Sequence, residues 1–384
     1  MDLMTLTAVL FAAVSLLGVD AVINSGSVSV EVRTAPQLSK QANWSVDDAT
    51  LDQEFENQLD RVALTPSIIN PPEIKPDSER SVGMALAEAA RVDGVARALQ
   101  ATLGYRPDRL RLAIYVEDGE IQGLITGNGH GTGYMVGNFR AILKPEKGES
   151  ILSFVRRCAL WGSSQLAPYF TALYLLRTHA DDGNFVSVDE VTNQTMARLP
   201  NTPVSADRAL FQNLQGIVAL FRNDPTTAAA KFDAAMASDP NDPVPVLNAA
   251  FTQLQLGYPA LADGLMERLV TEHPPTNKVL LATAYMTWAA AVAEQNDLVQ
   301  ADHLLTLATQ INPNSDAAFE LWADVKLRQG DQKAADALHR RALEGATTFE
   351  NYAEVASLYF RIPERGTKTI ARSQFTNPAL ANLR

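Results

Sequence analysis

The segment TGNGHGTG, at 126–133, is the first place in this sequence of 384 residues where residue types and spacing suggest chemistry. A phosphate-binding Walker loop needs Gly-Lys-Ser/Thr at the start of a helix, and a dinucleotide fingerprint needs G-x-G-x-x-G between a strand and a helix. The segment has no lysine, and Thr132 stands where the third glycine of the fingerprint belongs. We therefore expect no cofactor, and the glycines are better explained by a long hairpin connection that requires positive φ.

His130 and Cys158 are the pair that suggests nucleophilic catalysis, because a histidine can take the proton of an attacking thiol. Cys158, the only cysteine, falls in FVRRCALW, a pattern that predicts the middle of a helix rather than a loop after a strand. WGSSQ lacks the Gly-x-Ser-x-Gly elbow of a serine hydrolase. A hydrolase using His130 and Cys158 remains the alternative, while our expectation is no enzyme, no catalytic residue and no metal site.

The composition indicates a folded protein with protein partners. A hydrophobic content of 46% supports two or three packed domains. The net charge of -12 argues against a nucleic-acid partner, because phosphate binding needs clustered Lys and Arg. We expect a protein or peptide partner and no nucleic acid.

The amino terminus carries an uncharged apolar run at residues 3–19, at the lower edge of the length needed for a membrane span. It lacks the basic start and the small-residue cleavage site of a signal peptide, so we expect an uncleaved anchor over 1–24. The nearest basic residues, Arg33 and Lys40, would place the bulk in the cytoplasm, but two charges orient a large domain weakly. The expected localisation is a single-pass protein of the bacterial inner membrane with its bulk in the periplasm.

Residues 25–148 predict a small α+β module. Residues 27–32 alternate with the period of a strand, and 45–64 carry apolar residues at helical spacing, opened by Ser45 and Asp48 as a weak capping box. Four prolines at 65–79 predict an extended linker or edge crossing.

The second half of this module predicts a further helix and a β-meander. Residues 81–103 have helical spacing, with Gly104 after them as the expected C-terminal cap. Asp118-Gly119 lies between two alternating runs and predicts a tight hairpin, since a type I′ turn needs positive φ at both central positions. The run YMVGNFRAIL predicts the third strand.

From Glu149 onward the sequence predicts helices, and a repeat dominates. Small and apolar residues recur at the same offsets before a proline: Gly216, Ala228, Phe232 and Ala235 before Pro240; Ala250, Ala262, Met266 and Leu269 before Pro274; Ala289, Ala301, Leu305 and Ala308 before Pro313. A fourth unit keeps Ala323, Gly330, Ala335 and Ala342 but has Thr347 in place of the proline. The period is 34 residues, with about five extra between the second and third units.

This spacing predicts two antiparallel helices per unit, because small residues such as Gly216 and Ala228 let the two helices approach closely. The pattern resembles the tetratricopeptide repeat family over about 209–348. The usual early aromatic is displaced, since Trp288 and Trp322 stand at the seventh position of their units. The layout as a whole resembles membrane-anchored tetratricopeptide proteins of bacteria, which implies a scaffold.

The resemblance implies that the first helix of each unit, helix A, lines a concave groove that binds an extended peptide or a partner helix. The candidate groove residues are expected exposed positions of helix A, at Asn213, Asn248, Gln253, Tyr285 and Lys326. Asn248 is the most typical of the family, because an asparagine amide can both donate to and accept from a peptide backbone. The expected function is a membrane-tethered scaffold that binds its partner in this groove, with self-association through the repeats as a further alternative.

The sequence thus predicts a mainly α protein with a C-terminal tetratricopeptide α-solenoid, preceded by a small α+β module and an N-terminal transmembrane helix. The expected boundaries are a membrane anchor at 1–24, the α+β module at 25–148, connecting helices at 149–208 that include a degenerate repeat in one interpretation, repeats at 209–242, 243–276, 282–315 and 316–348, and a capping helix with the tail at 349–384.

Overall fold

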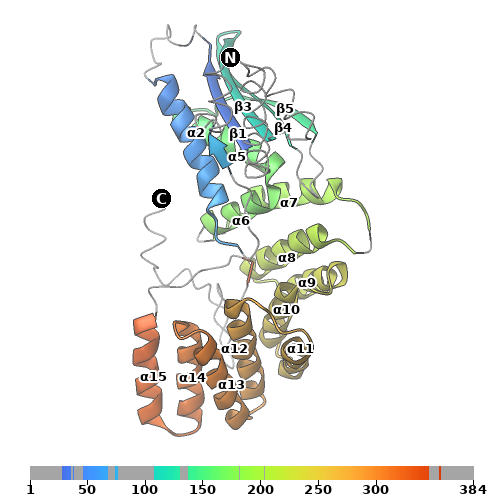
Figure 1. Cartoon of the computed structure of the whole chain (residues 1–384), viewed down its shortest axis with the longest axis vertical. Helices are drawn as coiled ribbons and strands as arrows, with labels where there is room; N and C mark the ends of the chain where they lie inside the picture. Colours follow the sequence, from blue (N-terminus) through green and yellow to red (C-terminus); the bar gives the residue numbers. More distant parts are fainter. Residues whose placement is uncertain are drawn as a thin grey trace, which may run out of the picture. The chain divides into compact units, whose positions relative to one another are not determined.

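The chain divides into two compact units, Met1–Thr65 with Asn70–Thr171 and Pro66–Ile69 with Ala172–Arg384, here named the sheet unit and the repeat unit (Figure 1). The computed structural model describes residues 28–35, 38, 46–67, 74–76, 108–129, 137–180, 182–202, 204–345 and 354–355. The expected mainly helical fold with a small sheet is confirmed.

The sheet unit contains a five-stranded mixed sheet in the order β2-β1-β3-β4-β5. Its strands are β1 (Val28–Thr34), β2 (Ile74–Pro76), β3 (Asp108–Glu117), β4 (Glu120–Asn128) and β5 (Asn138–Leu143). β3, β4 and β5 form the expected antiparallel meander, whereas β1 pairs in parallel with both β2 and β3. The proline-rich segment therefore supplies the edge strand β2, where the missing N–H of Pro76 is tolerated. The expected helix at 81–103 lies outside the described residues.

The turn between β3 and β4 forms as the sequence predicts. Asp118 and Gly119 have φ of 54° and 82°, and Glu117 pairs with Glu120 across the hairpin. Positive φ at both central residues gives the turn the twist that matches its two strands.

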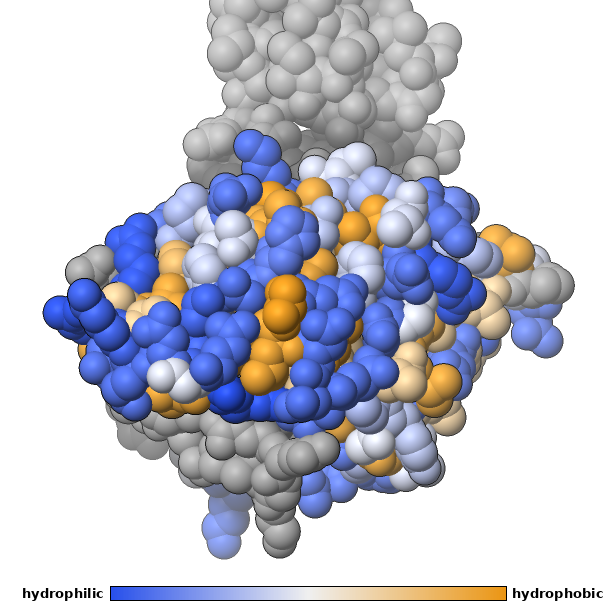
Figure 2. Space-filling model, turned by 90° about the horizontal axis from the view of Figure 1, so that it is seen from below, coloured by the Kyte–Doolittle hydropathy of each residue, from blue (hydrophilic) through white to orange (hydrophobic). Residues whose placement is uncertain are grey.

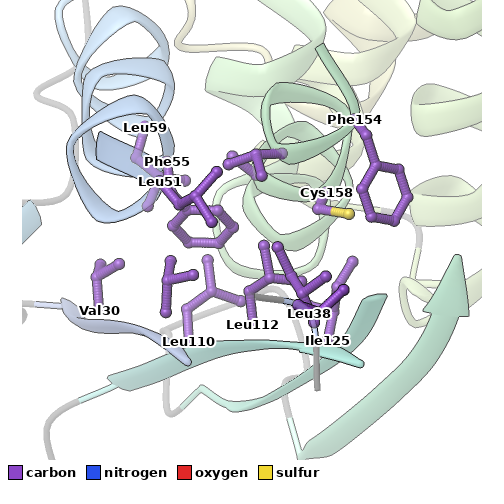
Figure 3. Packing of buried hydrophobic residues seen from close by; sticks show 14 residues of the cluster. Val30, Leu38, Leu51, Phe55, Leu59, Leu110, Leu112, Ile125, Phe154 and Cys158 are labelled. Carbon is purple, nitrogen blue, oxygen red and sulfur yellow. The ribbon is translucent and has the colours of Figure 1, made fainter. Parts of the chain in front are cut away.

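Helices α2 (Asp48–Ala63) and α5 (Ile151–Leu166) enclose the core of the sheet unit against the sheet (Figure 3). The N-cap of α2 is Asp47, whose carboxylate accepts a hydrogen bond from Thr50 N at 2.7 Å, so the expected cap at Ser45 is corrected. Phe55 from α2 and Phe154 from α5 are fully buried beside Leu110 and Leu112 of β3. Gly123 and Gly162 permit the close approach of α5, because a Cβ at either position would lie within 2.8 Å of a core side chain.

The repeat unit contains helices only, in the part of it that the structure describes. They are α6 (Pro168–Thr178), which begins in the sheet unit, α7 (Val186–Arg198), α8 (Ala206–Phe221), α9 (Pro225–Ser238), α10 (Pro243–Gln255), α11 (Pro259–Glu272), α12 (Lys278–Glu294), α13 (Leu298–Ile311), α14 (Asp316–Arg328) and α15 (Gln332–Gly345). From α8 onward the helices form four hairpins, α8-α9, α10-α11, α12-α13 and α14-α15, and successive hairpins stack on each other.

Each hairpin turns through one residue in the left-handed conformation. These residues are Asn223, Gly257, Asn296 and Gly330, with φ between 56° and 84°. Asparagine and glycine are the residues that adopt this conformation at least cost after a helix C-terminus. Proline at the start of α9, α10 and α11 fits the first helical turn, where its missing N–H has no partner to lose.

The two helices of the first hairpin touch through Gly216. A Cβ on Gly216 would lie 2.4 Å from Cε1 of Phe232, and this ring is fully buried. Ala250 and Ala262 are buried at the equivalent positions of the second hairpin, and Ala289 and Ala301 in the third. The small residues of the 34-residue pattern therefore lie where helix A meets helix B.

The expected membrane localisation is contradicted. In the parts of the chain that the structure describes, no helix is long and apolar enough to cross a membrane. The longest of them, α12, has 17 residues, and a span needs about 20. The apolar run at residues 3–19, on which the expectation rested, lies outside the described residues.

The exposed apolar residues of the repeat unit are spread over several helices. Tyr258, Leu261, Val299 and Leu343 are each more than half exposed. On the face drawn in Figure 2, hydrophilic residues dominate and apolar groups occur in small separate areas. Scattered groups of this kind are usual on soluble surfaces, so this face gives no reason to place a binding site on it.

Candidate functional site

Cys158 is buried in the core of the sheet unit and does not have the surroundings of a nucleophile. Its side chain is fully buried between α5 and the sheet (Figure 3). Burial raises the pKa of this thiol to about 12, and the nearby Arg157 offsets only part of that rise. Arg157 is itself engaged by Glu149, with Nη2 2.6 Å from the carboxylate. A protonated, inaccessible thiol cannot attack a substrate, and its expected partner His130 lies outside the described residues.

We predict that Cys158 stays unmodified by iodoacetamide in the folded protein. Because its pKa is raised, the reactive thiolate is absent at neutral pH and remains scarce as the pH rises to about 9. Mass spectrometry should show no adduct in native buffer and one adduct per chain in urea. Rapid labelling of the native protein at neutral pH would restore the hydrolase hypothesis.

In the described residues, no group of three or more His, Cys, Asp or Glu side chains is arranged to hold a metal ion.

The structure brings two of the five candidate groove residues together. Asn213 lies on α8 and Asn248 on α10, so each comes from helix A of one of the first two hairpins. Asn248 Nδ2 donates to Asn213 Oδ1 at 2.7 Å. Both residues are buried, with 2% and 0% of their surface exposed, so the expectation that they lie on an exposed helix face is wrong. We name this pair the asparagine clamp.

A main-chain carbonyl of the same chain is bound by the clamp. Asn213 Nδ2 and Asn248 Nδ2 donate to the backbone oxygen of Glu354 at 3.0 and 2.8 Å. A peptide carbonyl has two lone pairs and can accept both bonds. The clamp therefore holds a peptide backbone, and in this structure the backbone belongs to the chain itself.

The side chains of Glu354 and Val355 make further contacts next to the bound carbonyl. Ser67 Oγ donates to Glu354 Oε1 at 2.7 Å. Val355 is fully buried in a cluster that includes Leu247 of α10 and Leu280 of α12. Burial of a valine side chain contributes roughly 1.5 to 3 kcal/mol. Glu354 and Val355, named here the cis segment, are thus fixed by backbone, charge and apolar contacts together.

The other three candidates have different surroundings. Gln253 is half-buried on α10, and its carbonyl accepts a hydrogen bond from Tyr258 N in the turn. Tyr285 is half-buried on α12 and packs against the core of the third hairpin. Lys326 Nζ lies 2.6 Å from Asp302 Oδ1, so its charge is already paired. A role for these three residues in partner binding stays a prediction.

Neither the cis segment nor Ser67 stands out in the sequence. The expected capping helix lies within 349–384, and of that range the structure describes only Glu354 and Val355. Glu354 binds the clamp on α8 and α10, in the first two hairpins, and its three hydrogen bonds given above span 106 to 287 residues along the chain. No local pattern reports a contact at such separations.

The displaced tryptophans of the repeat have a structural role. Trp288 Nε1 donates to Asp263 Oδ1 at 2.7 Å, and Trp322 Nε1 donates to Asp302 Oδ1 at 2.6 Å. Each aspartate lies on helix B of one hairpin and each tryptophan on helix A of the next. Burial disfavours ionisation of Asp302, but its bonds from Lys326 and Trp322 outweigh this and keep the pKa of the carboxyl below its usual value. The same bond thus ties successive hairpins at two junctions.

We predict that Trp322→Phe lowers the free energy of unfolding by about 1.5 to 3 kcal/mol, because it removes a hydrogen bond to a charged group. Urea denaturation followed by circular dichroism measures the loss, and a double-mutant cycle with Asp302→Asn isolates the pair. The lowered pKa of Asp302 means that this stabilisation is present at neutral pH and is lost as the pH falls below the ordinary range of the carboxyl. A coupling near zero would show that the indole only fills space.

The four hairpins share a 34-residue period, small residues between their two helices and stacking of successive hairpins, and in these features they resemble tetratricopeptide repeats. Asn213 and Asn248 occupy helix A of the first two repeats, and the cis segment lies against them.

Several solved structures resemble part of this chain at low identity. No known family model and no curated protein matches the sequence. Among solved structures, MamA MSR-1 is 16% identical, with 45% of this chain and 95% of that chain covered and a TM-score of 0.32. The Pseudomonas aeruginosa pilF protein is 12% identical over 46% and 76%, with a TM-score of 0.39. YrrB, described as a TPR protein with an unusual peptide-binding site, is 15% identical over 49% and 90%, with a TM-score of 0.34. At these values the repeat assignment rests on the hairpins themselves.

Proposed function

We propose that the repeat unit is a peptide-binding scaffold, in which Asn213 and Asn248 hold an extended partner segment by a main-chain carbonyl. The observation that supports this function is the convergence of two amide donors on the carbonyl of Glu354. A carbonyl inside a helix already accepts a bond from its own chain, so a clamp of this kind favours non-helical segments, and Glu354 itself lies in a turn. Since every peptide offers such a carbonyl, the clamp supplies affinity and the neighbouring residues must supply selectivity.

The proposal is tested with an array of immobilised ten-residue peptides, probed with the fluorescently labelled full chain. The chain's own segment occupies the clamp, so the Val355→Asp variant is probed beside the wild type to free it. We expect a subset of peptides to bind, and Asn213→Ala and Asn248→Ala to abolish that binding. Each substitution removes one of the two converging donors and leaves buried polar groups without a partner, at about 1 to 3 kcal/mol per group.

Asn241→Ala is the matched control, because Asn241 is exposed in the loop between α9 and α10. The control should bind the same peptides as its parent. Binding that survives both clamp substitutions, or an array with no bound peptide for any variant, would contradict the proposed function.

A further inference from the structure

The residues around the cis segment contact its two side chains as well as its backbone. Two amide donors fix the carbonyl of Glu354, and the Ser67 hydroxyl donates to its carboxylate at 2.7 Å. The next side chain, Val355, is enclosed by apolar residues of α10 and α12. An acidic residue followed by a β-branched apolar residue satisfies all three features at once.

Several contacts that build the hairpins do not involve the cis segment, although Val355 packs in the cluster of α10 to α12. Gly216 and Phe232 pack helix A of the first hairpin on helix B, and the turn at Asn223 completes it. The Trp–Asp bonds tie the later hairpins without residues beyond α14. These hairpin contacts are therefore independent of the segment, as expected if the segment acts as a ligand on a scaffold that the repeats form.

We propose that the cis segment is a displaceable ligand carried by the chain itself, and that the external partner is an extended peptide with an acidic residue followed by valine or isoleucine, which competes for the same contacts. This inference rests on the proposed function. A tethered ligand is present at an effective concentration in the millimolar range. The wild-type chain therefore binds such a partner weakly, and release of the segment increases the affinity by about tenfold or more.

The full chain offers a direct assay, because its only cysteine is buried and unreactive. Val355→Cys places one thiol at the contact. We expect this thiol to be protected from iodoacetamide in the free protein. An excess of the peptide that copies residues 350–359 should raise its labelling rate by about fivefold or more, since the peptide competes with a tethered ligand.

One altered peptide and two further variants of the chain serve as controls. The same peptide with Val355→Asp should leave the labelling rate unchanged, because a charged side chain does not enter the apolar cluster. Asn248→Leu in the Val355→Cys chain should give rapid labelling without peptide, while Asn241→Ala should not. If the Val355→Cys chain does not keep the helical circular dichroism signal of the wild type, the Glu354→Cys chain replaces it in the same labelling assay.

The outcomes decide the inference. Immediate labelling in the free protein would show that the segment does not rest on the clamp. Protection that no excess of peptide relieves would show a fixed structural element rather than a ligand. If the array instead selects peptides that depend on Asn213 and Asn248 but lack the acidic-apolar pair, the proposed function stands and this inference fails.

Discussion

Gly216→Val is expected to destabilise the repeat unit more than any other single substitution of a helix glycine in the described hairpins. A Cβ at this position would lie 2.4, 2.7 and 2.8 Å from three atoms of the buried Phe232 ring. The ring belongs to the adjacent helix and has no exposed surface into which it could rotate. Overpacking of this kind costs about 1 to 3 kcal/mol or more, and Gly216→Val adds two further methyl groups to the clash. Urea denaturation followed at the helical circular dichroism band measures the loss.

Gly264→Ala is the matched control for Gly216→Ala. Gly264 lies inside α11, and a Cβ there would meet nothing within 4 Å. Its replacement should therefore raise stability by up to about 1 kcal/mol, because alanine is the better helix former. Gly216→Ala should act in the opposite direction despite the same gain in helix propensity. Equal effects of the two substitutions would mean that the helices do not meet at Gly216.

The repeat could be predicted from sequence because its determinants are local and periodic. Gly216 and Phe232 belong to one hairpin, and their spacing recurs in the next units. The hairpin at Asp118-Gly119 is predictable for a similar reason, since two adjacent residues determine the turn. The parallel pairing of β1 with β2 and β3 was missed, because parallel strands are joined by long connections and leave no short-range signal.

The groove site stays a prediction, although the structure brings two of its residues together. Asparagine on helix A indicated recognition of a partner's backbone, and the carbonyl that Asn213 and Asn248 bind in this structure belongs to the chain itself. What the sequence could not provide was the identity of that backbone, since Glu354 follows Asn248 by 106 residues. An isolated Glu-Val pair has no distinctive pattern, and its importance comes from the apolar residues and the Ser67 hydroxyl that the fold brings around it.

Asn248→Asp tests the clamp with nearly unchanged shape and should make the repeat unit sensitive to pH. In the wild type, Asn248 Nδ2 donates to two acceptors, Asn213 Oδ1 at 2.7 Å and the carbonyl oxygen of Glu354 at 2.8 Å. A carboxylate in its place would put a buried charge against both. We expect a loss of about 3 to 5 kcal/mol at neutral pH, the usual cost of an uncompensated buried charge, or release of the cis segment to avoid it.

The sign of the pH dependence follows from burial. Desolvation and the two facing acceptors both favour the protonated acid, so the pKa of the new carboxyl is raised in the folded state. Stability is then better retained at low pH, where the protonated acid can make one of the two hydrogen bonds that the amide makes, and is lost as the pH rises through the raised pKa. Urea midpoints at about pH 4.5 and pH 7.5 should therefore differ more for Asn248→Asp than for the wild type, which carries the same Glu354 carboxyl.

Asn248→Leu removes the donors without adding an acid and should show the pH profile of the wild type at lower stability. Asn241→Asp, in an exposed loop, should show neither effect. An Asn248→Asp chain with wild-type stability at neutral pH would place the side chain in water and remove the basis for the clamp.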